Sequence, residues 1–294
     1  MSIMNKNEII SMLKLLEDPD DSVYGLIRQK ILDDFELYRP YLENYHALSI
    51  NELALERSEE LLEDMFLYSY ETRLESYLKQ KDHSLLDGVL LIEEYFNRDV
   101  DTDLIRTETE NIIQSIWLEF NDQLTGIEKV KLIGKTLFEK FNFKKFPLGD
   151  FKPEQLSFAN CVNSKRYAAP NISLLYCVIS QSMDIPLYPL ALPGLFVLSY
   201  VDAELADAVF VEKNNGSVFY IHPFDEGEFV NHQIIEKYLS DKKIEKRLDD
   251  FGNMTYVEYL SFFFELRILA LKHKNRKGFE LDNADRIKEV FRRK

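Results

Sequence analysis

Residues 165–225 constrain the fold more than any other stretch, because an almost wholly apolar helix is followed there by short β-type runs. Between Pro170 and Met183 the apolar side chains fall on most of the circumference of a helix, at positions 172, 174, 175, 178 and 179. This pattern predicts a helix that is buried on nearly every side. Pro186 follows in the triplet Asp184-Ile185-Pro186 and predicts where the helix ends.

Several short runs rich in Val, Leu and Phe come after this helix, namely LYPLALP (187–193), LFVLSYV (195–201), AVFVEK (208–213) and SVFYIHPF (217–224). Runs of this length and composition are typical of β-strands. The pair Asn215-Gly216 separates the last two runs, and it favours a tight hairpin because both central turn residues need positive φ. We therefore expect a small antiparallel sheet beside the helix, with its last strand ending near Pro223.

The flanking regions read as helices. Ser22 is predicted to cap a helix whose apolar face carries Val23, Leu26, Ile27 and Ile31, and Pro40 is predicted to break the chain before the next helix. Two pairs have the spacing of a capping box, Ser49 with Glu52 and Thr125 with Glu128. Residues 233–294 return to helical periodicity, and the last twenty or so residues, which are basic and polar, either pack as a final helix or fray.

These patterns predict an α+β protein with three parts. Residues 1–145 form a helical region, residues 146–232 the core with the buried helix and sheet, and residues 233–294 the C-terminal helices that pack on that core. The segment LLEDPDDSVYGLIRQKILDDFELYRPYLENY resembles one helical hairpin of the HEAT type, with an Asp-Pro turn between its helices. No second copy follows at a fixed period, so a helical bundle with HEAT-like character is expected rather than a solenoid.

The net charge of −15, from 51 acidic and 36 basic residues, argues against nucleic acid and anionic membrane surfaces as partners. The two cysteines, Cys161 and Cys177, lie in segments that we expect to be buried, and their spacing predicts neither a disulfide framework nor a zinc site. The first residues lack the pattern of a signal peptide, and no apolar run approaches the roughly 18 residues of a membrane span. We therefore expect a cytoplasmic protein.

A family resemblance emerges from the order of short motifs in the second half. They are LFEKFNF (137–143), a Ser-Phe-x-Asn segment at 157–160, a basic pair at 165–166, Asp-Ile-Pro-Leu-Tyr at 184–188, Leu-Pro-Gly-x-Phe at 192–196 and Phe-Tyr-Ile-x-Pro-Phe at 219–224. In this order they resemble the bacterial transglutaminase-like proteins, in the branch with a helical N-terminal region and a papain-like core. The resemblance covers about residues 125–230.

The resemblance implies a catalytic triad, but the sequence departs from it at each position. The family's nucleophile, a serine or cysteine at the start of the buried helix, corresponds to Asn171 or Ile172, depending on which flanking motif anchors the count. The family's histidine, in Leu-Pro-Gly-His-Phe, corresponds to Leu195, and its aspartate, in Ile-Asp-Pro-Phe, to His222. Because an isobutyl group cannot accept a proton, Leu195 removes the general base.

The sequence offers three other arrangements of reactive groups. Ser173 and His222 would make a serine–histidine dyad, although a helix serine is more often bonded to a carbonyl. Cys177 would be a nucleophile, although it lies one and a half turns into an apolar helix, where a thiol is rarely acidic. A metal site would need side chains that are spaced closely along one loop, at positions 222, 225, 226, 228 and 232.

The sequence thus favours a transglutaminase-like core that has lost its triad and serves as a ligand-binding, protein-binding or scaffold module. No cofactor and no metal are expected, and a protein or peptide is the expected kind of partner. The alternative is a hydrolase or acyltransferase with a rearranged centre at Ser173 and His222.

Overall fold

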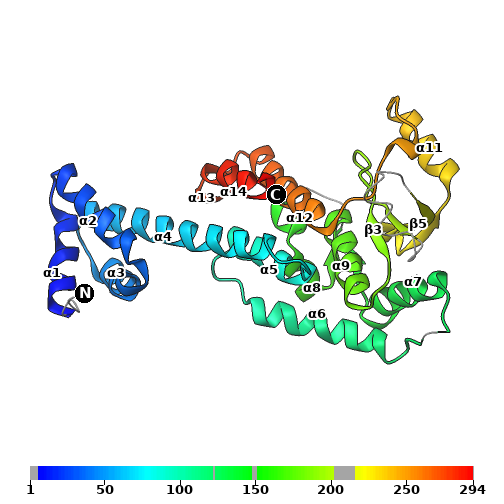
Figure 1. Ribbon diagram of the computed structural model, residues 1–294, viewed down its shortest axis with the longest axis horizontal. Helices are drawn as coiled ribbons and strands as arrows, with labels where there is room; N and C mark the ends of the chain where they lie inside the picture. The colour runs from blue at the N-terminus through cyan, green and yellow to red at the C-terminus, as the bar shows by residue number, and fades with distance from the viewer. Residues whose placement is uncertain (1–5, 122, 148–150, 202–215, 294) are drawn as a thin grey trace. The chain divides into compact units, whose positions relative to one another are not determined.

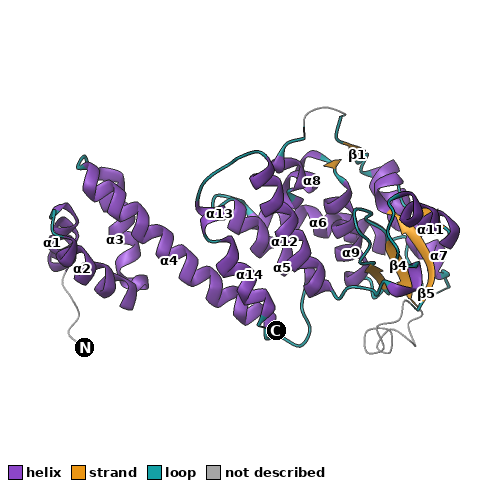
Figure 2. Ribbon diagram, turned by 90° about the horizontal axis from the view of Figure 1, so that it is seen from above, coloured by secondary structure: helices purple, strands orange, loops and turns teal. Residues whose placement is uncertain are grey.

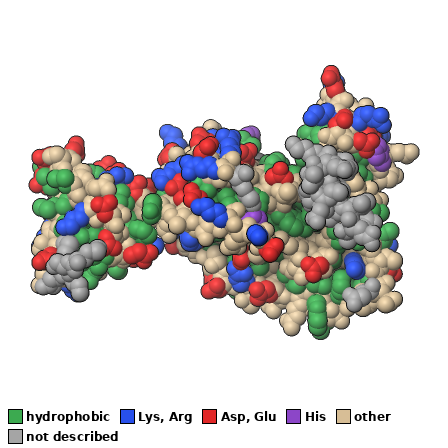
Figure 3. Space-filling view, in the orientation of Figure 1, with side chains coloured by type: hydrophobic (Ala, Val, Ile, Leu, Met, Phe, Trp, Pro, Cys, Tyr) green, Lys and Arg blue, Asp and Glu red, His purple; other side chains and the backbone are tan. Residues whose placement is uncertain are grey.

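A computed structural model describes residues 6–121, 123–147, 151–201 and 216–293 of the chain (Figure 1). The chain forms two compact units, Met1–Ser76 and Tyr77–Lys294. Figure 2 shows that helices make up most of the described chain, and Figure 3 shows acidic and basic side chains interspersed with apolar ones on one face. The three-part division at residues 145 and 232 stays a prediction.

The first unit consists of helices, which are α1 (Lys6–Leu13), the 3-10 helix η1 (Lys14–Glu17), α2 (Asp21–Asp33), α3 (Phe35–Leu48) and the greater part of α4 (Glu52–Leu78). Their apolar faces meet in one core, with residues such as Leu16, Ile31, Leu42 and Leu61 fully buried. The expected helical character of this region is confirmed, whereas its HEAT-like character stays a prediction.

Three local predictions for this unit were wrong. Helix α2 is capped by Asp20, whose carboxylate accepts from the backbone N–H of Ser22, so Ser22 already lies inside the helix. Pro40 lies within α3 and does not end it. Ser49 is the residue after α3, and the cap of α4 comes from Asn51, whose side-chain oxygen accepts from the Ala54 N–H at 3.0 Å. In the two capping cases a residue close by in the chain satisfies the helix end instead.

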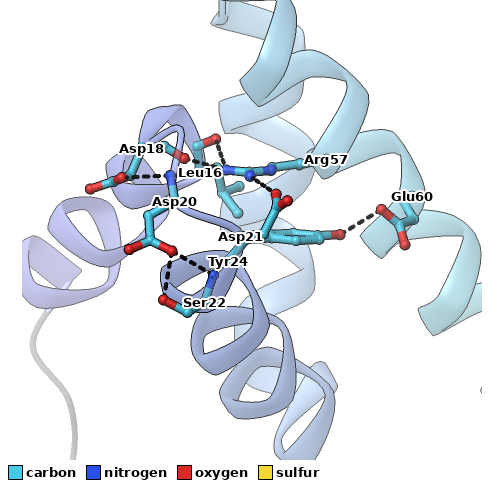
Figure 4. Close-up of polar contacts among 8 residues, drawn as sticks. All are labelled: Leu16, Asp18, Asp20, Asp21, Ser22, Tyr24, Arg57 and Glu60. Carbon is cyan, nitrogen blue, oxygen red and sulfur yellow. Dashed lines mark hydrogen bonds and ion pairs between the residues drawn. The ribbon is translucent and has the colours of Figure 1, made fainter.

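A buried arginine fixes the Asp-Pro turn of the first unit (Figure 4). Arg57, on α4, is 4% exposed, and its guanidinium donates to the carbonyl oxygens of Leu16 (3.2 Å) and Asp18 (2.5 Å) and to the carboxylate of Asp21 (2.8 Å). It also lies 4.5 Å from the ring centre of Tyr24. A planar group with several fixed donors is well suited to satisfy these carbonyls at once.

The second unit is built mostly from helices. They are α5 (Leu85–Phe96), α6 (Thr102–Trp117), α7 (Gly126–Gly134), the π-helix η2 (Lys135–Lys140), η3 (Pro153–Leu156), α8 (Phe158–Ser164), α9 (Ala169–Ser182), η4 (Pro223–Asp225), α11 (His232–Asp241), η5 (Leu248–Asp250), α12 (Tyr256–His273), α13 (Phe279–Asp282) and α14 (Ala284–Arg292). The predicted capping box of Thr125 and Glu128 is confirmed at α7. The C-terminal α14 packs rather than frays, because Ile287, Val290 and Phe291 are buried.

The strands of this unit form two sheets. One is antiparallel with the order β3-β4-β5-β6, comprising β3 (Leu187–Pro189), β4 (Leu198–Val201), β5 (Ser217–His222) and β6 (Glu228–Val230). The other is a two-stranded parallel pair, β1 (Lys144–Lys145) with β2 (Arg166–Tyr167). The predicted antiparallel sheet is confirmed, whereas the predicted run 208–213 and the turn residue Asn215 lie outside the described residues.

Helix α9 is the centre of the second unit, as predicted. Every residue from 170 to 180 is buried, because α5, α8, β3 and η4 all pack against the helix. Figure 1 shows α9 between α8 and the strand β3. A helix surrounded in this way has no polar face, which explains its nearly continuous apolar sequence.

A buried carboxylate joins three helices around this centre. Glu93 of α5 is 1% exposed and accepts from the Phe158 N–H (2.8 Å) and the Ser157 hydroxyl (2.7 Å) at the start of α8. It also pairs with Arg267 of α12 at 2.5 Å, and the Arg267 guanidinium lies 4.0 Å from the ring centre of Phe96. The carboxylate therefore finds hydrogen-bond donors from both neighbouring helices, as a buried charge requires.

Within the parts of the chain that the structure describes, no helix has both the length and the apolar character needed to cross a membrane.

Removing Glu93 alone is expected to destabilise the second unit strongly. The substitution Glu93→Ala leaves the buried Arg267 charge without its carboxylate and should lower the free energy of unfolding by about 3–5 kcal/mol. The double substitution Glu93→Met with Arg267→Met should cost less, because no buried charge remains. Urea unfolding measures both.

The matched control for this prediction is Arg276→Ala, which breaks an exposed pair with Glu154 and should change the stability by about 1 kcal/mol or less. Equal losses for Glu93→Ala and Arg276→Ala would contradict the prediction.

Candidate functional site

The N-terminal end of α9, where the family resemblance places the nucleophile, is closed by hydrogen bonds. Asn171 is completely buried. Its amide nitrogen donates to the carbonyl oxygens of Gln155 (2.8 Å) and Ser157 (3.1 Å), and its amide oxygen accepts from the Ala168 N–H (2.9 Å). The two amide hydrogens thus attach the start of α9 to the segment at the start of α8, and the oxygen caps α9 itself. Asn171 positions backbone here and has no nucleophilic group.

The next two residues of α9 are also completely buried. Ile172 contributes only hydrocarbon. Ser173 donates its hydroxyl to the Phe196 carbonyl at 3.5 Å, and the Tyr259 hydroxyl donates to the Pro170 carbonyl at 3.3 Å. Burial raises the pKa of Tyr259, and a hydrogen bond with Ser173 opposes that rise. Two hydroxyl groups therefore lie at the first turn of α9, and both are enclosed by packing.

The thiols are equally enclosed. Cys161 and Cys177 have no exposed surface, and burial raises the pKa of each thiol. A thiol is the weak nucleophile and its thiolate the strong one, so both side chains are held in the less reactive form at neutral pH. The prediction that both cysteines are buried is confirmed.

Leu195, which the family resemblance places at the histidine position, lines a small apolar pocket. The pocket has a volume of about 190 Å³, and its walls are the residues around β3 together with α12, namely Pro189, Leu190, Ala191, Leu192, Pro193, Phe196, Val197, Met254, Tyr259 and Phe262. The preceding Gly194 has φ +72°, and the Tyr238 hydroxyl fixes the same loop by donating to the Pro193 carbonyl at 2.9 Å. Tyr259 connects this pocket to the first turn of α9.

His222, which the family resemblance places at the aspartate position, is the last residue of β5 and is oriented by a carboxylate. Its Nδ1 lies 2.7 Å from the Asp225 carboxylate, whose other oxygen lies 2.6 Å from the Lys145 ammonium. Lys145 also lies 4.4 Å from the ring centre of Phe224. The Lys145 hydrogen bond, followed by that of His222, lowers the pKa of Asp225. An imidazole held in this way presents its Nε2 as a base or donor.

The structure does not bring Ser173 and His222 together by a hydrogen bond within the described residues. The hydroxyl of Ser173 is directed to Phe196 and the imidazole of His222 to Asp225. His232, which also belongs to the candidate metal site of positions 222–232, lies 3.7 Å from Asp249 and 3.9 Å from Glu236. Among the described residues no group of three or more His, Cys, Asp or Glu side chains is arranged to hold a metal ion.

Two residues that shape this region were missed by the sequence analysis. Tyr259 reaches the start of α9 from 89 positions away, and Lys145 reaches Asp225 from 80 positions away. Tyr259 lies in an apolar helical pattern, where its hydroxyl was the only signal of a polar role. Lys145 lies in a short basic run, which is usually a solvated surface.

Replacing Lys145 should raise the pKa of Asp225 toward its ordinary value. Because the folded pKa is lowered, ionised Asp225 contributes stability above its ordinary pKa, and this contribution is lost as the pH falls through the folded value. In Lys145→Met the Asp225 carboxyl should titrate at higher pH. The free energy of unfolding should then fall less steeply as the pH is lowered. Carboxyl ¹³C NMR measures the titration. Lys135→Met, which breaks a pair with Glu119, is the control, and an unchanged Asp225 titration in Lys145→Met would count against the assignment.

Comparison with known proteins gives one family match. The model of the Transglutaminase-like superfamily matches residues 103–261, more than half of the chain, which includes α6 to α9, the antiparallel sheet and the start of α12. The search of curated proteins found no match, and neither did the search of solved structures. The motifs of the second half, the buried helix with its antiparallel sheet and the family match agree. The chain therefore belongs to the transglutaminase-like superfamily.

Proposed function

We propose that this protein is a non-catalytic member of the superfamily, in which the core serves as a binding module. The observation that carries the proposal is the packing at the start of α9. An amide that is fully hydrogen-bonded, a buried isoleucine and a buried serine occupy the positions where the chemistry needs an accessible nucleophile. Acyl transfer requires a nucleophile within reach of a base and of the substrate carbonyl.

The position of the general base supports the same proposal. Leu195 contributes a hydrocarbon side chain to an apolar pocket, so a proton taken from a nucleophile has no acceptor there. His222 is oriented by Asp225 as a catalytic histidine is, and this favours the rival function of a hydrolase or acyltransferase centred on Ser173 and His222. Against that rival, Ser173 has no exposed surface, and its hydroxyl is directed to the Phe196 carbonyl.

The pocket at Leu195 supports a proposal for what the module binds. Its volume of about 190 Å³ is below the roughly 300–1,000 Å³ that is usual for small-molecule sites. Its walls are apolar apart from backbone groups and the Tyr259 hydroxyl. An apolar side chain presented by a peptide suits both the size and the chemistry, so a protein or peptide partner is proposed rather than a metabolite.

The helical N-terminal region contributes a second surface in this proposal. Within the first unit, Leu26, Leu48 and Ile50 are 75%, 73% and 96% exposed. In this proposal these exposed aliphatic side chains contribute apolar area to partner binding. A HEAT-like adaptor surface, on a protein that works in the cytoplasm, completes the proposed function.

Labelling with reactive probes tests the absence of catalysis. The native chain is treated with a fluorophosphonate and, separately, with iodoacetamide, and the modified residues are mapped by mass spectrometry. We expect no modification of Ser173 and equally slow modification of Cys177 and Cys161, because both thiols are buried and have raised pKa values.

Cys161 is the matched control inside the same chain, and unfolding in urea must expose both cysteines to the reagent. Modification of Ser173, or much faster modification of Cys177 than of Cys161 in the native protein, would show a reactive centre and refute the proposal.

A further inference from the structure

A second pocket in the Tyr77–Lys294 unit lies apart from Leu195. Its volume is about 590 Å³, and it is lined on one side by α7 and η2 and on the other by Glu226 and Gly227, just after η4. Figures 1 and 2 both show α7 beside the sheet that carries β5. The pocket therefore lies between a helix and a turn of the same compact unit, and its size is that of a ligand site.

The floor of this pocket has unusual backbone geometry. η2 is a π-helix, in which the Phe141 N–H donates to the Thr136 carbonyl at 3.0 Å. This form is rare and often marks functional sites. Two lining glycines, Gly134 and Gly227, approach the Tyr176 hydroxyl so closely that a Cβ on them would lie 3.1 Å and 2.5 Å from its oxygen.

The Tyr176 hydroxyl is a buried polar group directed at this floor. Its side chain has no exposed surface, and the hydroxyl makes no hydrogen bond with any described residue. An unpaired buried hydroxyl is costly, and in native proteins it calls for an explanation. Its place beside two glycines of the lining puts this hydroxyl directly behind the wall of the pocket.

Two of the four carboxylates that line the pocket are held by neither an ion pair nor a helix cap among the described residues. Glu119 pairs with Lys135 at 3.1 Å. Glu128 is held in the capping box with Thr125, and Lys131 further favours its charged form and so lowers its pKa. Glu139 and Glu226 also line the pocket, and neither forms an ion pair with a described residue.

The chemistry of the lining favours one kind of cation. Two carboxylates are too few for the six to eight oxygen ligands that calcium takes, whereas the same lining contains an aromatic side chain, Phe138, and aromatic rings attract organic cations. A guanidinium group is planar, weakly hydrated and able to contact carboxylates and an aromatic face together. We propose that this pocket binds the guanidinium group of an arginine side chain on a partner protein.

This inference is independent of the proposed function, because the pocket shares no lining residue with the pocket at Leu195. The test is a calorimetric titration of the full chain at low salt with N-acetyl-arginine amide, and with N-acetyl-lysine amide for comparison. The arginine compound should bind saturably and more tightly than the lysine compound. The fluorescence of Trp117, the only tryptophan in the chain and two residues before Glu119, gives a second readout.

Matched variants locate the binding. Glu139→Gln and Glu226→Gln should each weaken it by about fivefold or more, because a charge-assisted contact is replaced by a neutral one. Glu110→Gln removes the same charge from an exposed position outside the pocket and should leave the affinity unchanged. All three positions are exposed, so the melting temperatures should stay equal.

Three outcomes would overturn the inference. They are the absence of saturable binding of the arginine compound, an affinity for it in the double variant Glu139→Gln with Glu226→Gln that equals that of the unaltered chain, and equal affinities for the lysine and arginine compounds.

Discussion

The second unit depends on one buried carboxylate. Glu93 is almost without exposed surface, yet it holds the first backbone N–H and the capping serine of α8 and pairs with Arg267 of α12. A charge in this position is tolerated only because donors surround it. By joining α5, α8 and α12, it fixes the segment around Ser157. Asn171, at the start of α9, donates hydrogen bonds to the backbone of this segment.

This arrangement supports the proposal that the transglutaminase-like core here persists without the family's chemistry. The helix to which the family resemblance assigns the nucleophile is here enclosed by packing, and side-chain hydrogen bonds to backbone carbonyls hold its start, so its first turn is part of the core. Leu195 adds a hydrocarbon side chain to that core. A general base in its place would need access to solvent and to the nucleophile. The proposed peptide contact and the proposed arginine contact use different pockets of the same frame, so one chain could engage two features of a partner.

The sequence predicted those features that local pattern or burial alone determines. The helix around Tyr176 was predictable because it is apolar on all sides, and the Thr125–Glu128 box because its partners are three residues apart. Pro40 was misjudged because it lies within α3 rather than at its end, and Ser49 because Asn51, two residues further on, supplies the cap of α4. The contacts of Lys145 and Tyr259 could not be predicted, because each joins residues about 80–90 positions apart.

The central claim is that the start of α9 is closed core rather than a reaction site. Native-state hydrogen exchange of the full chain tests it most directly. The account predicts that the amides of residues 172–176 exchange as slowly as those of residues 263–268 in the buried part of α12, because both segments open only with the unit as a whole. Exchange at residues 172–176 as fast as at the first turn of the peripheral helix α11 would mean that this end opens to solvent, and it would contradict the account.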